Sequence, residues 1–194
     1  MKFNKGILEN FLADVFDLLA FLVFVGGIVL FIRFFIANPY TVVGSSMSPT
    51  FEENNFIIVD KITPRFGQLN RGDVIVFVPP GKNVPYIKRI IGLPGETVKI
   101  HDGGIYICNS GAVEDCKKLE ENYLPDYVTT EARCGKSEFK IESGFFVMGD
   151  NRGFSTDSLC CFGLGCFEGT NYTVPSNYMI GKVYVRIIPD FKVF

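Results

Sequence analysis

Residues 74–100, VIVFVPPGKNVPYIKRIIGLPGETVKI, contain three short apolar runs that are separated by proline and glycine. The runs span residues 74–78, 86–91 and 97–100 and are rich in β-branched and aromatic residues. Runs of this length, bounded by turn-forming sequences, are typical of β-strands. The stretch therefore predicts consecutive strands of a β-sheet.

Similar apolar runs occur on both sides of this stretch, at residues 56–59, 105–107, 144–148 and 180–188. No segment after residue 37 keeps a helical period of useful length, so residues 38–194 are predicted to form a predominantly β domain. Residues 109–140 are more polar and predict a solvent-facing insertion or a long hairpin. The lone His101, in KIHDG, is predicted to be a turn residue at a hairpin.

The first 37 residues have a different composition. Residues 18–32, LLAFLVFVGGIVLFI, carry no charge, and extending them to Ala37 gives twenty residues. At about 1.5 Å per residue, a helix of that length spans the ~30 Å hydrocarbon core of a bilayer. Arg33 lies one turn from the end, where its long side chain can reach the interface. We therefore predict a short cytoplasmic tail and one transmembrane helix in residues 1–37.

The alternative for this segment is a cleaved signal peptide. Its apolar core is usually shorter, and its cleavage site needs small residues at positions −3 and −1. The sequence Phe35-Ile36-Ala37 places a phenylalanine at −3, which favours an uncleaved anchor. Lys2 and Lys5 before the span, against Arg33 after it, give only a weak positive-inside bias.

Composition excludes some classes of function. The chain has 194 residues with 19 basic and 21 acidic side chains, a net charge of −2 and a pI near 5.5. Such a chain has no bulk attraction for phosphate, so nucleic acid is not the expected partner. Apolar residues make up 47% and charged residues 21%, which excludes a disordered chain.

All six cysteines follow residue 107: Cys108, Cys116, Cys134, Cys160, Cys161 and Cys166. An even number in an anchored β domain favours disulfides and an oxidising compartment, although six cysteines allow fifteen pairings. Cys108 and Cys116 flank a short loop between strand-like segments and are the favoured pair. Reduced core thiols and a metal site are the alternatives, but the spacing matches no standard zinc pattern, so no metal is expected.

A serine-rich turn, Gly44-Ser45-Ser46-Met47-Ser48-Pro49-Thr50, follows the anchor by about ten residues. It can be a simple turn that leads into a strand. It can also present a nucleophilic hydroxyl, with backbone N–H groups free to hold an oxyanion.

Two adjacent cations lie in the run at residues 86–91. Strand alternation places Lys88 and Arg89 on opposite faces, so one of them points inward unless this is an edge strand with both cations solvated. Burial lowers the pKa of a lysine, and a neutral amine can serve as the general base for a serine without any histidine.

Two polar segments complete the candidate site. The turn Arg71-Gly72-Asp73 enters the strand at residues 74–78 and is structural when taken alone. Residues 149–158, GDNRGFSTDS, follow an apolar run and are rich in short polar side chains. Such a loop either orients other groups or is simply a turn.

Taken in order, SMSPT, RGDVIVF, YIKRIIGLPGE and GDNRGFSTDS resemble the motifs of bacterial type I signal peptidases, which are membrane-bound enzymes with a Ser/Lys dyad. The similarity covers about residues 38–100 and 143–188. It implies that Ser46 is the nucleophile, that Lys88 is the general base and that Ser155 orients the lysine. It also implies that the Ser46 N–H donates to the oxyanion and that Arg89, Asp150 and Asp157 support the loop.

The resemblance implies an all-β catalytic domain with a variable β insertion at about residues 101–143. The implied function is cleavage of signal peptides from exported preproteins through an acyl-enzyme, without a cofactor. The expected place is the outer face of the cytoplasmic membrane, with a single membrane pass. The expected partners are signal peptides and the lipid bilayer, and the chain is expected to be a monomer.

The sequence departs from the family pattern at three places. Gly44 stands where some members have a serine that donates to the oxyanion, so backbone alone or a neighbouring hydroxyl such as Ser45 completes the hole. Leu159 replaces an arginine, so Asp157 is expected to lack its usual partner. The cysteine-rich stretch after Leu159 and the insertion are outside the pattern.

Three other classes of protein fit the sequence less well. A sortase-like transpeptidase would use His101, a cysteine from residues 160–166 and Arg186, but the sequence has no TLxTC-like strand end. A self-cleaving Ser/Lys repressor would need a DNA-binding domain in place of the anchor. A non-catalytic anchored β module has no use for these four motifs in this order.

Overall fold

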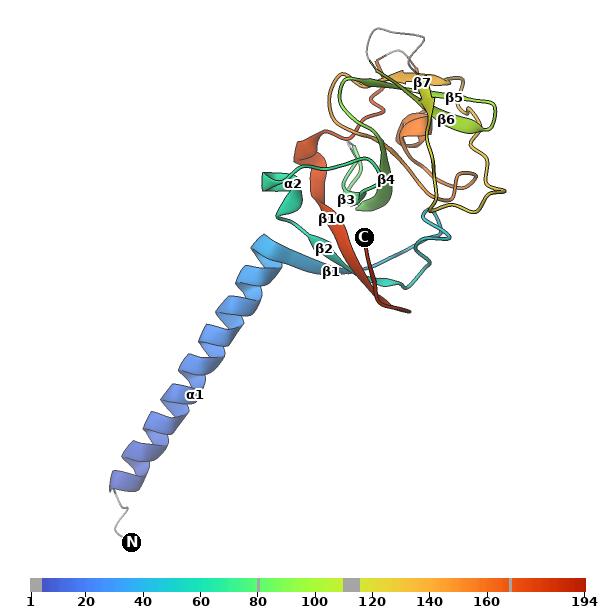
Figure 1. Cartoon of the computed structure of the whole chain (residues 1–194). Coiled ribbons are helices and arrows are strands. Elements are labelled where there is room, and N and C mark those ends of the chain that lie inside the picture. The colour runs from blue at the N-terminus through green and yellow to red at the C-terminus, as the bar shows by residue number, and fades with distance from the viewer. Residues whose placement is uncertain (1–4, 80, 110–115, 168) are drawn as a thin grey trace.

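A computed structural model describes residues 5–79, 81–109, 116–167 and 169–194, with side chains from residue 10 onward in the first helix. The chain forms a long helix that projects away from a β domain (Figure 1). The predicted loop at residues 110–115, Pro80 of the predicted turn, and the side chains of Lys2 and Lys5 lie outside this description. The weak orientation argument from those two lysines is therefore not addressed by the structure.

The N-terminal helix is longer than the apolar run predicts. Helix α1 spans Lys5–Phe31 and continues into a π-helical segment, η1, at Ile32–Ile36. The section at Asn10–Ile36 is long and apolar enough to cross a membrane, and none of it is buried against the domain. The helix begins before residue 18 because Asp14 and Asp17, which end the apolar run, are exposed and do not interrupt a helix.

The larger sheet has seven strands in the order β1-β2-β10-β3-β4-β9, with β11 paired to β10. Its strands are β1 Ala37–Thr41, β2 Phe56–Asp60, β3 Val74–Phe77, β4 Tyr86–Gly92, β9 Phe146–Met148, β10 Met179–Ile188 and β11 Lys192–Val193. All these pairings are antiparallel. Strand β4 therefore lies between β3 and β9, near one end of the sheet.

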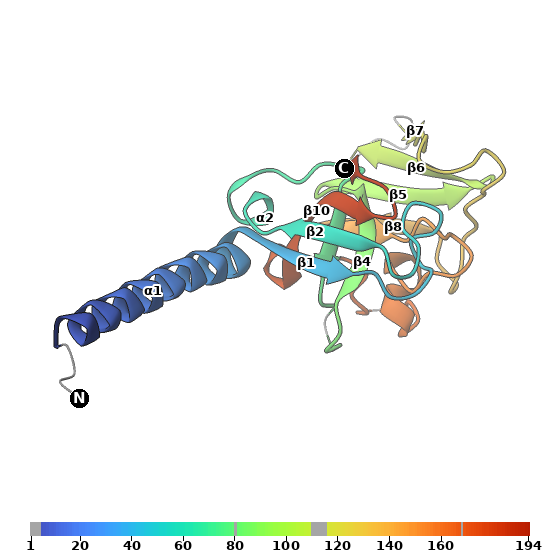
Figure 2. The same ribbon diagram turned by 90° about the horizontal axis from the view of Figure 1, so that it is seen from below.

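The smaller sheet has four antiparallel strands in the order β7-β6-β5-β8. Its strands are β5 Glu96–His101, β6 Gly104–Asn109, β7 Cys116–Lys118 and β8 Glu138–Lys140. Figure 2 shows the β5–β6 pair to one side of β1, β2 and β10. The turn at Asp102-Gly103 has positive φ at both residues, as a two-residue hairpin loop requires. His101 is exposed at the end of β5, which confirms its predicted place at a hairpin.

Three short helical segments connect the strands: α2 at Thr63–Phe66, η2 at Ser158–Gly163 and η3 at Ser176–Tyr178. The fold is mainly β with an N-terminal apolar helix, so the predicted fold class is confirmed. A domain boundary between residues 37 and 38 stays a prediction.

Strand β1 was not predicted, because Asn38 and Pro39 normally mark turns. Pro39 is tolerated because β1 is an edge strand, where one side of the backbone needs no sheet partner.

The segment at residues 109–140 is more than the predicted solvent-facing insertion. Phe139 on β8 is completely buried, together with Phe146 of β9 at a ring-centroid distance of 4.8 Å. Both belong to a core cluster that also contains Ile91 and Val98 and joins the two sheets. The prediction of a solvent-facing insertion or a long hairpin fails at Phe139, because alternation along β8 turns this apolar side chain inward.

Replacement of Phe139 by alanine tests this core. Phe139→Ala is expected to lower the free energy of unfolding by about 3–5 kcal/mol, because it leaves a cavity between the sheets. The matched control is Phe66→Ala, since Phe66 is 85% exposed on α2 and its removal is expected to change stability by less than about 0.5 kcal/mol. Denaturant unfolding of the full chain in detergent measures both, and equal effects would contradict the assignment of Phe139 to the core.

Candidate active site

The serine-rich turn is held by two buried side chains. Met47 and Phe51 are fully buried, and the Phe51 N–H donates to the Met47 carbonyl at 2.9 Å. Both pack in the cluster that contains Ile57 and Val59 of β2. The position between exposed Ser45 and buried Met47 leaves the Ser46 side chain only partly covered.

Lys88 lies on β4, which pairs with both β3 and β9 and is therefore no edge strand. Its side chain points to the Ser46 turn, and Lys88 Nζ lies 2.6 Å from Ser46 Oγ. Nζ also donates to the Ile87 carbonyl at 2.7 Å. The residue is 3% exposed, so the alternative in which both cations are solvated is wrong.

The environment changes the protonation of Lys88. Burial disfavours the charged ammonium and lowers the pKa of Lys88 to about 8, against the opposing effect of the carboxylates of Asp157 and Asp150. An amine with this pKa is partly neutral near neutral pH and can then accept a proton.

Arg89 points to the opposite face of β4, as strand alternation predicts. Its Nε and Nη2 donate to the two carboxylate oxygens of Asp150 at 2.9 and 2.6 Å. Nη1 donates to the carbonyl of Gly72 at 2.8 Å, which connects the Arg71-Gly72-Asp73 turn to the site. This ion pair is buried on both sides and fixes the start of the loop at residues 149–158.

We call residues 149–158 the polar loop. Inside it, the Asp157 carboxylate is fully buried and accepts hydrogen bonds from the N–H groups of Gly149 and Leu159 at 2.9 and 3.1 Å. Among the described residues no cation pairs with Asp157, as expected from Leu159, and backbone N–H groups serve as its partners instead. Leu159 itself packs in the core.

Ser155 lies at the site but forms no hydrogen bond to Lys88. Ser155 is 8% exposed, and its Oγ has no hydrogen-bond partner among the described residues. A Cβ on Gly149 would clash with Ser155 Oγ and with the Ser46 carbonyl, so both serines lie directly against this glycine. An orienting role for Ser155 stays a prediction.

Gly44 and Ser45 lie at the open side of the turn. Gly44 has φ +86°, a conformation that side chains rarely adopt, which accounts for glycine where a serine was expected. Ser45 is exposed, and its carbonyl accepts a hydrogen bond from Asn151 Nδ2 at 3.0 Å. The Asn151 N–H donates to the Ser46 carbonyl at 3.1 Å, so the polar loop and the turn are joined directly.

A groove of about 710 Å³ opens beside Ser46 and Lys88. Its walls come from three places: residues 40–46 after the anchor, residues 84–88 around the start of β4, and Phe154 with Thr156 of the polar loop. Ile57 and Val76 make its floor apolar. Such a groove suits an extended apolar peptide whose backbone passes the Ser46 hydroxyl.

The sequence did not reveal a network behind the polar loop. Arg152 is buried and donates to Glu121 at 2.8 Å and to Thr130 at 2.6 Å. The ring of Tyr123 lies 3.8 Å from the Arg89 guanidinium. An arginine inside a polar loop was the only available signal, since nothing in the sequence pairs it with a glutamate some thirty residues earlier.

All six cysteines form disulfides. The predicted pair Cys108–Cys116 is confirmed, and the other two pairs are Cys134–Cys160 and Cys161–Cys166. No thiol is left for a metal site or for a sortase-like nucleophile. His101 lies on the exposed β5–β6 hairpin, stacked on Tyr106.

Comparison with known proteins finds similarity to signal peptidases. A family model described as "Signal peptidase, peptidase S26" matches residues 15–188. The chain is 38% identical to "Signal peptidase I" of Leptolyngbya laminosa over 169 residues, which is 81% of this chain and 72% of the relative. It is 39% identical to "Signal peptidase I" of Bacillus licheniformis over 70% of this chain and 73% of the relative. A crystal structure of a signal peptidase I from Enterococcus faecalis aligns with a TM-score of 0.39 and 27% identity, over 59% of this chain and 96% of that one.

The close approach at Gly149 gives a test of the site geometry. Gly149→Ala is expected to lower the free energy of unfolding by about 1–3 kcal/mol, because the new methyl group forces the Ser46 turn and Ser155 apart. Gly153→Ala, in the same loop, places a methyl group in open space and is expected to leave stability nearly unchanged. Thermal unfolding of both variants in detergent compares them, and a Gly149→Ala protein as stable as the wild type would show that the two segments are not in contact.

Proposed function

Because this chain belongs to the signal peptidase family, peptidase S26, we propose that it removes signal peptides as a serine endopeptidase with Ser46 as nucleophile and Lys88 as general base. Signal-peptide cleavage is the activity of the family, and the roles of the two residues are carried over from its motifs onto Ser46 and Lys88. The observation that carries it is the 2.6 Å separation of Lys88 Nζ and Ser46 Oγ beside an open groove.

The proposed reaction is acyl transfer. Neutral Lys88 accepts the hydroxyl proton as Ser46 Oγ attacks the carbonyl of the last signal-peptide residue. The resulting ammonium protonates the departing amine of the mature protein. Water, deprotonated by the same lysine, then hydrolyses the ester to release the signal peptide. Every step uses side chains and water, so the proposal needs no cofactor.

The oxyanion is proposed to bind the Ser46 backbone N–H. This N–H has no hydrogen-bond partner among the described residues, so it is free to donate to a substrate oxygen. Gly44 and Ser45 border the same space, and Gly44 contributes no side chain to it. The unpartnered Ser155 hydroxyl is proposed to bond Lys88 once the substrate excludes water.

The supporting roles follow from the contacts. Arg89 and Asp150 are proposed to hold the polar loop against β4, and Asp157 is proposed to favour the ammonium formed during the reaction. Arg89 stays protonated at any working pH and is therefore excluded as the base.

The substrate and the location are proposed from the anchor and the groove. A preprotein held in the same bilayer is concentrated at the enzyme, and its extended cleavage region presents alternate side chains to the apolar groove. Small residues at −1 and −3 are therefore expected. Three disulfides support an oxidising, extracytoplasmic place for the domain, with one pass through the cytoplasmic membrane. A monomer is sufficient for this chemistry.

Removal of the Ser46 hydroxyl tests the nucleophile. Ser46→Ala is expected to lower kcat/KM for preprotein cleavage by at least about a thousandfold, because the acyl-enzyme cannot form. Ser48→Ala is the matched control, because the Ser48 hydroxyl donates to Glu52. This variant is expected to keep kcat/KM within about threefold of the wild type. Mass spectrometry of the new N-terminus measures the product, and full activity of Ser46→Ala would end the proposal.

The pH dependence tests the base. The neutral amine is the active form, so kcat/KM is expected to rise with pH through a midpoint of about 8 and to level off above it. Lys88→Arg keeps the charge but is expected to lose nearly all activity at every pH. Arg89→Lys, on the opposite face, is expected to lower stability while the midpoint stays in place. A flat profile from about pH 6 to 10, or an active Lys88→Arg enzyme, would contradict the role of Lys88.

A further inference from the structure

We propose that segment 121–134 positions the polar loop of the peptidase from outside, through the Cys134–Cys160 disulfide and the Glu121–Arg152 ion pair. The inference rests on the proposed function, because it concerns the setting of Lys88 beside Ser46. It gives a role to a disulfide and to a part of the insertion that the four sequence motifs leave unassigned.

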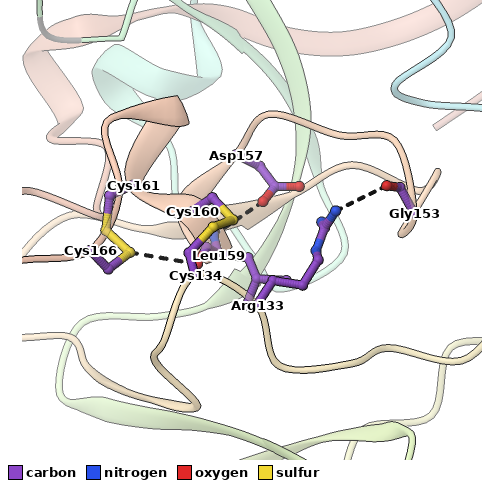
Figure 3. Close-up of a disulfide and its surroundings, with 8 residues drawn as sticks. All are labelled: Arg133, Cys134, Gly153, Asp157, Leu159, Cys160, Cys161 and Cys166. Carbon is purple, nitrogen blue, oxygen red and sulfur yellow. Dashed lines mark hydrogen bonds between the residues drawn. A yellow bond between two sulfur atoms is a disulfide. The ribbon is translucent and has the colours of Figure 1, made fainter.

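The disulfide acts at the end of the polar loop. Cys160 follows Asp157 by three residues, and its N–H donates to the Asp157 carbonyl at 3.3 Å. Cys134 is 26 residues earlier in the sequence, so the bond joins two segments that the chain alone does not hold together. Figure 3 shows this disulfide beside Asp157 and Leu159. Closing a loop of this length removes much of the freedom of the unjoined segments.

The same segment also contacts the middle of the polar loop. Arg133 Nη1 donates to the Gly153 carbonyl at 3.0 Å, as Figure 3 shows. Arg152 donates from Nη1 to Glu121 at 2.8 Å and from Nε to the Gly149 carbonyl at 3.1 Å. The Arg152 and Glu121 side chains are only 3% and 14% exposed, so solvent screens this ion pair weakly.

The polar loop in turn covers Lys88. Asp150 and Asp157, both on the polar loop, are the charged groups that act on the Lys88 ammonium, while Arg89 points to the other face of β4. The ring of Tyr86 lies 5.7 Å from Lys88 Nζ. If the loop moves outward, water reaches Nζ, which raises the pKa of Lys88, and the two carboxylates move away, which lowers it. Burial is the larger of these effects, so the pKa is expected to rise toward 10.5. A smaller fraction of the enzyme is then active at neutral pH.

The pH profile separates positioning from general loss of structure. The double variant Cys134→Ser/Cys160→Ser, as the full chain in detergent with a preprotein substrate, is expected to lose at least about tenfold in kcat/KM at pH 7. Its midpoint is expected to move upward by about one pH unit, so that activity recovers at pH 9–10. Because folding is linked to the protonation of Lys88, the folded fraction of each variant is measured at every pH by circular dichroism, and kcat/KM is expressed per folded molecule before midpoints are compared.

The matched control is Cys108→Ser/Cys116→Ser, which removes a disulfide between β6 and β7 of the smaller sheet. Its midpoint and its kcat/KM are expected to stay within about threefold of the wild type. A Cys134/Cys160 variant with the wild-type midpoint and rate would overturn the inference, as would an equal shift in both double variants.

A second pair of variants keeps every disulfide, so it tests the inference even if the Cys134→Ser/Cys160→Ser variant does not fold. Glu121→Gln breaks the ion pair with Arg152 and is expected to move the midpoint upward, whereas Glu120→Gln, at an exposed neighbour, is expected not to. No difference between these two variants would overturn the inference. Failure of the proposed function gives a different result from failure of this inference. In that case the Lys88→Arg variant would keep the activity of the wild type.

Discussion

The burial of one lysine is the constraint on which the rest of the structure depends. Lowering the pKa of Lys88 from 10.5 to about 8 means that the folded chain holds the ammonium less favourably than the unfolded chain does. Below pH 8 the difference costs about 3 kcal/mol, and the cost disappears as pH rises toward 10.5. This is a large share of the stability of an ordinary domain. The fold must offset it elsewhere, in the core that joins the two sheets.

Among the described residues, Lys88 forms no ion pair, whereas its neighbour Arg89 does. Arg89, its neighbour on β4, is satisfied on the opposite face by Asp150 and the Gly72 carbonyl. Asp157 is occupied by two backbone N–H groups, so it influences Lys88 through its field without forming an ion pair with it. A direct ion pair would hold the lysine in its charged form and remove the proposed base.

Sequence reasoning reached much of the local structure because short-range patterns encode it, whereas the proposed pair of Ser46 and Lys88, 42 residues apart, came from the resemblance to signal peptidases. Alternation along residues 86–91 separates Lys88 from Arg89 whatever the rest of the fold does. The contacts between Glu121 and Arg152, and between Cys134 and Cys160, depend on how the insertion folds back onto the polar loop. No local spacing encodes that path. Strand β1 was missed for the opposite reason, since its local signal favours a turn and pairing with β2 overrides it.

The junction between the anchor and the β domain is short and is held by a hydrogen bond. The helical segment η1 ends at Ile36 and β1 begins at Ala37, with no residue between them, while Lys61 Nζ donates to the Arg33 carbonyl at 3.0 Å. β1 ends at Thr41, five residues before Ser46, so one strand and one short segment link the end of the anchor to the Ser46 turn. If the chain cleaves signal peptides as proposed, this short junction limits cleavage to peptide bonds at a matching distance from the membrane segment of the substrate.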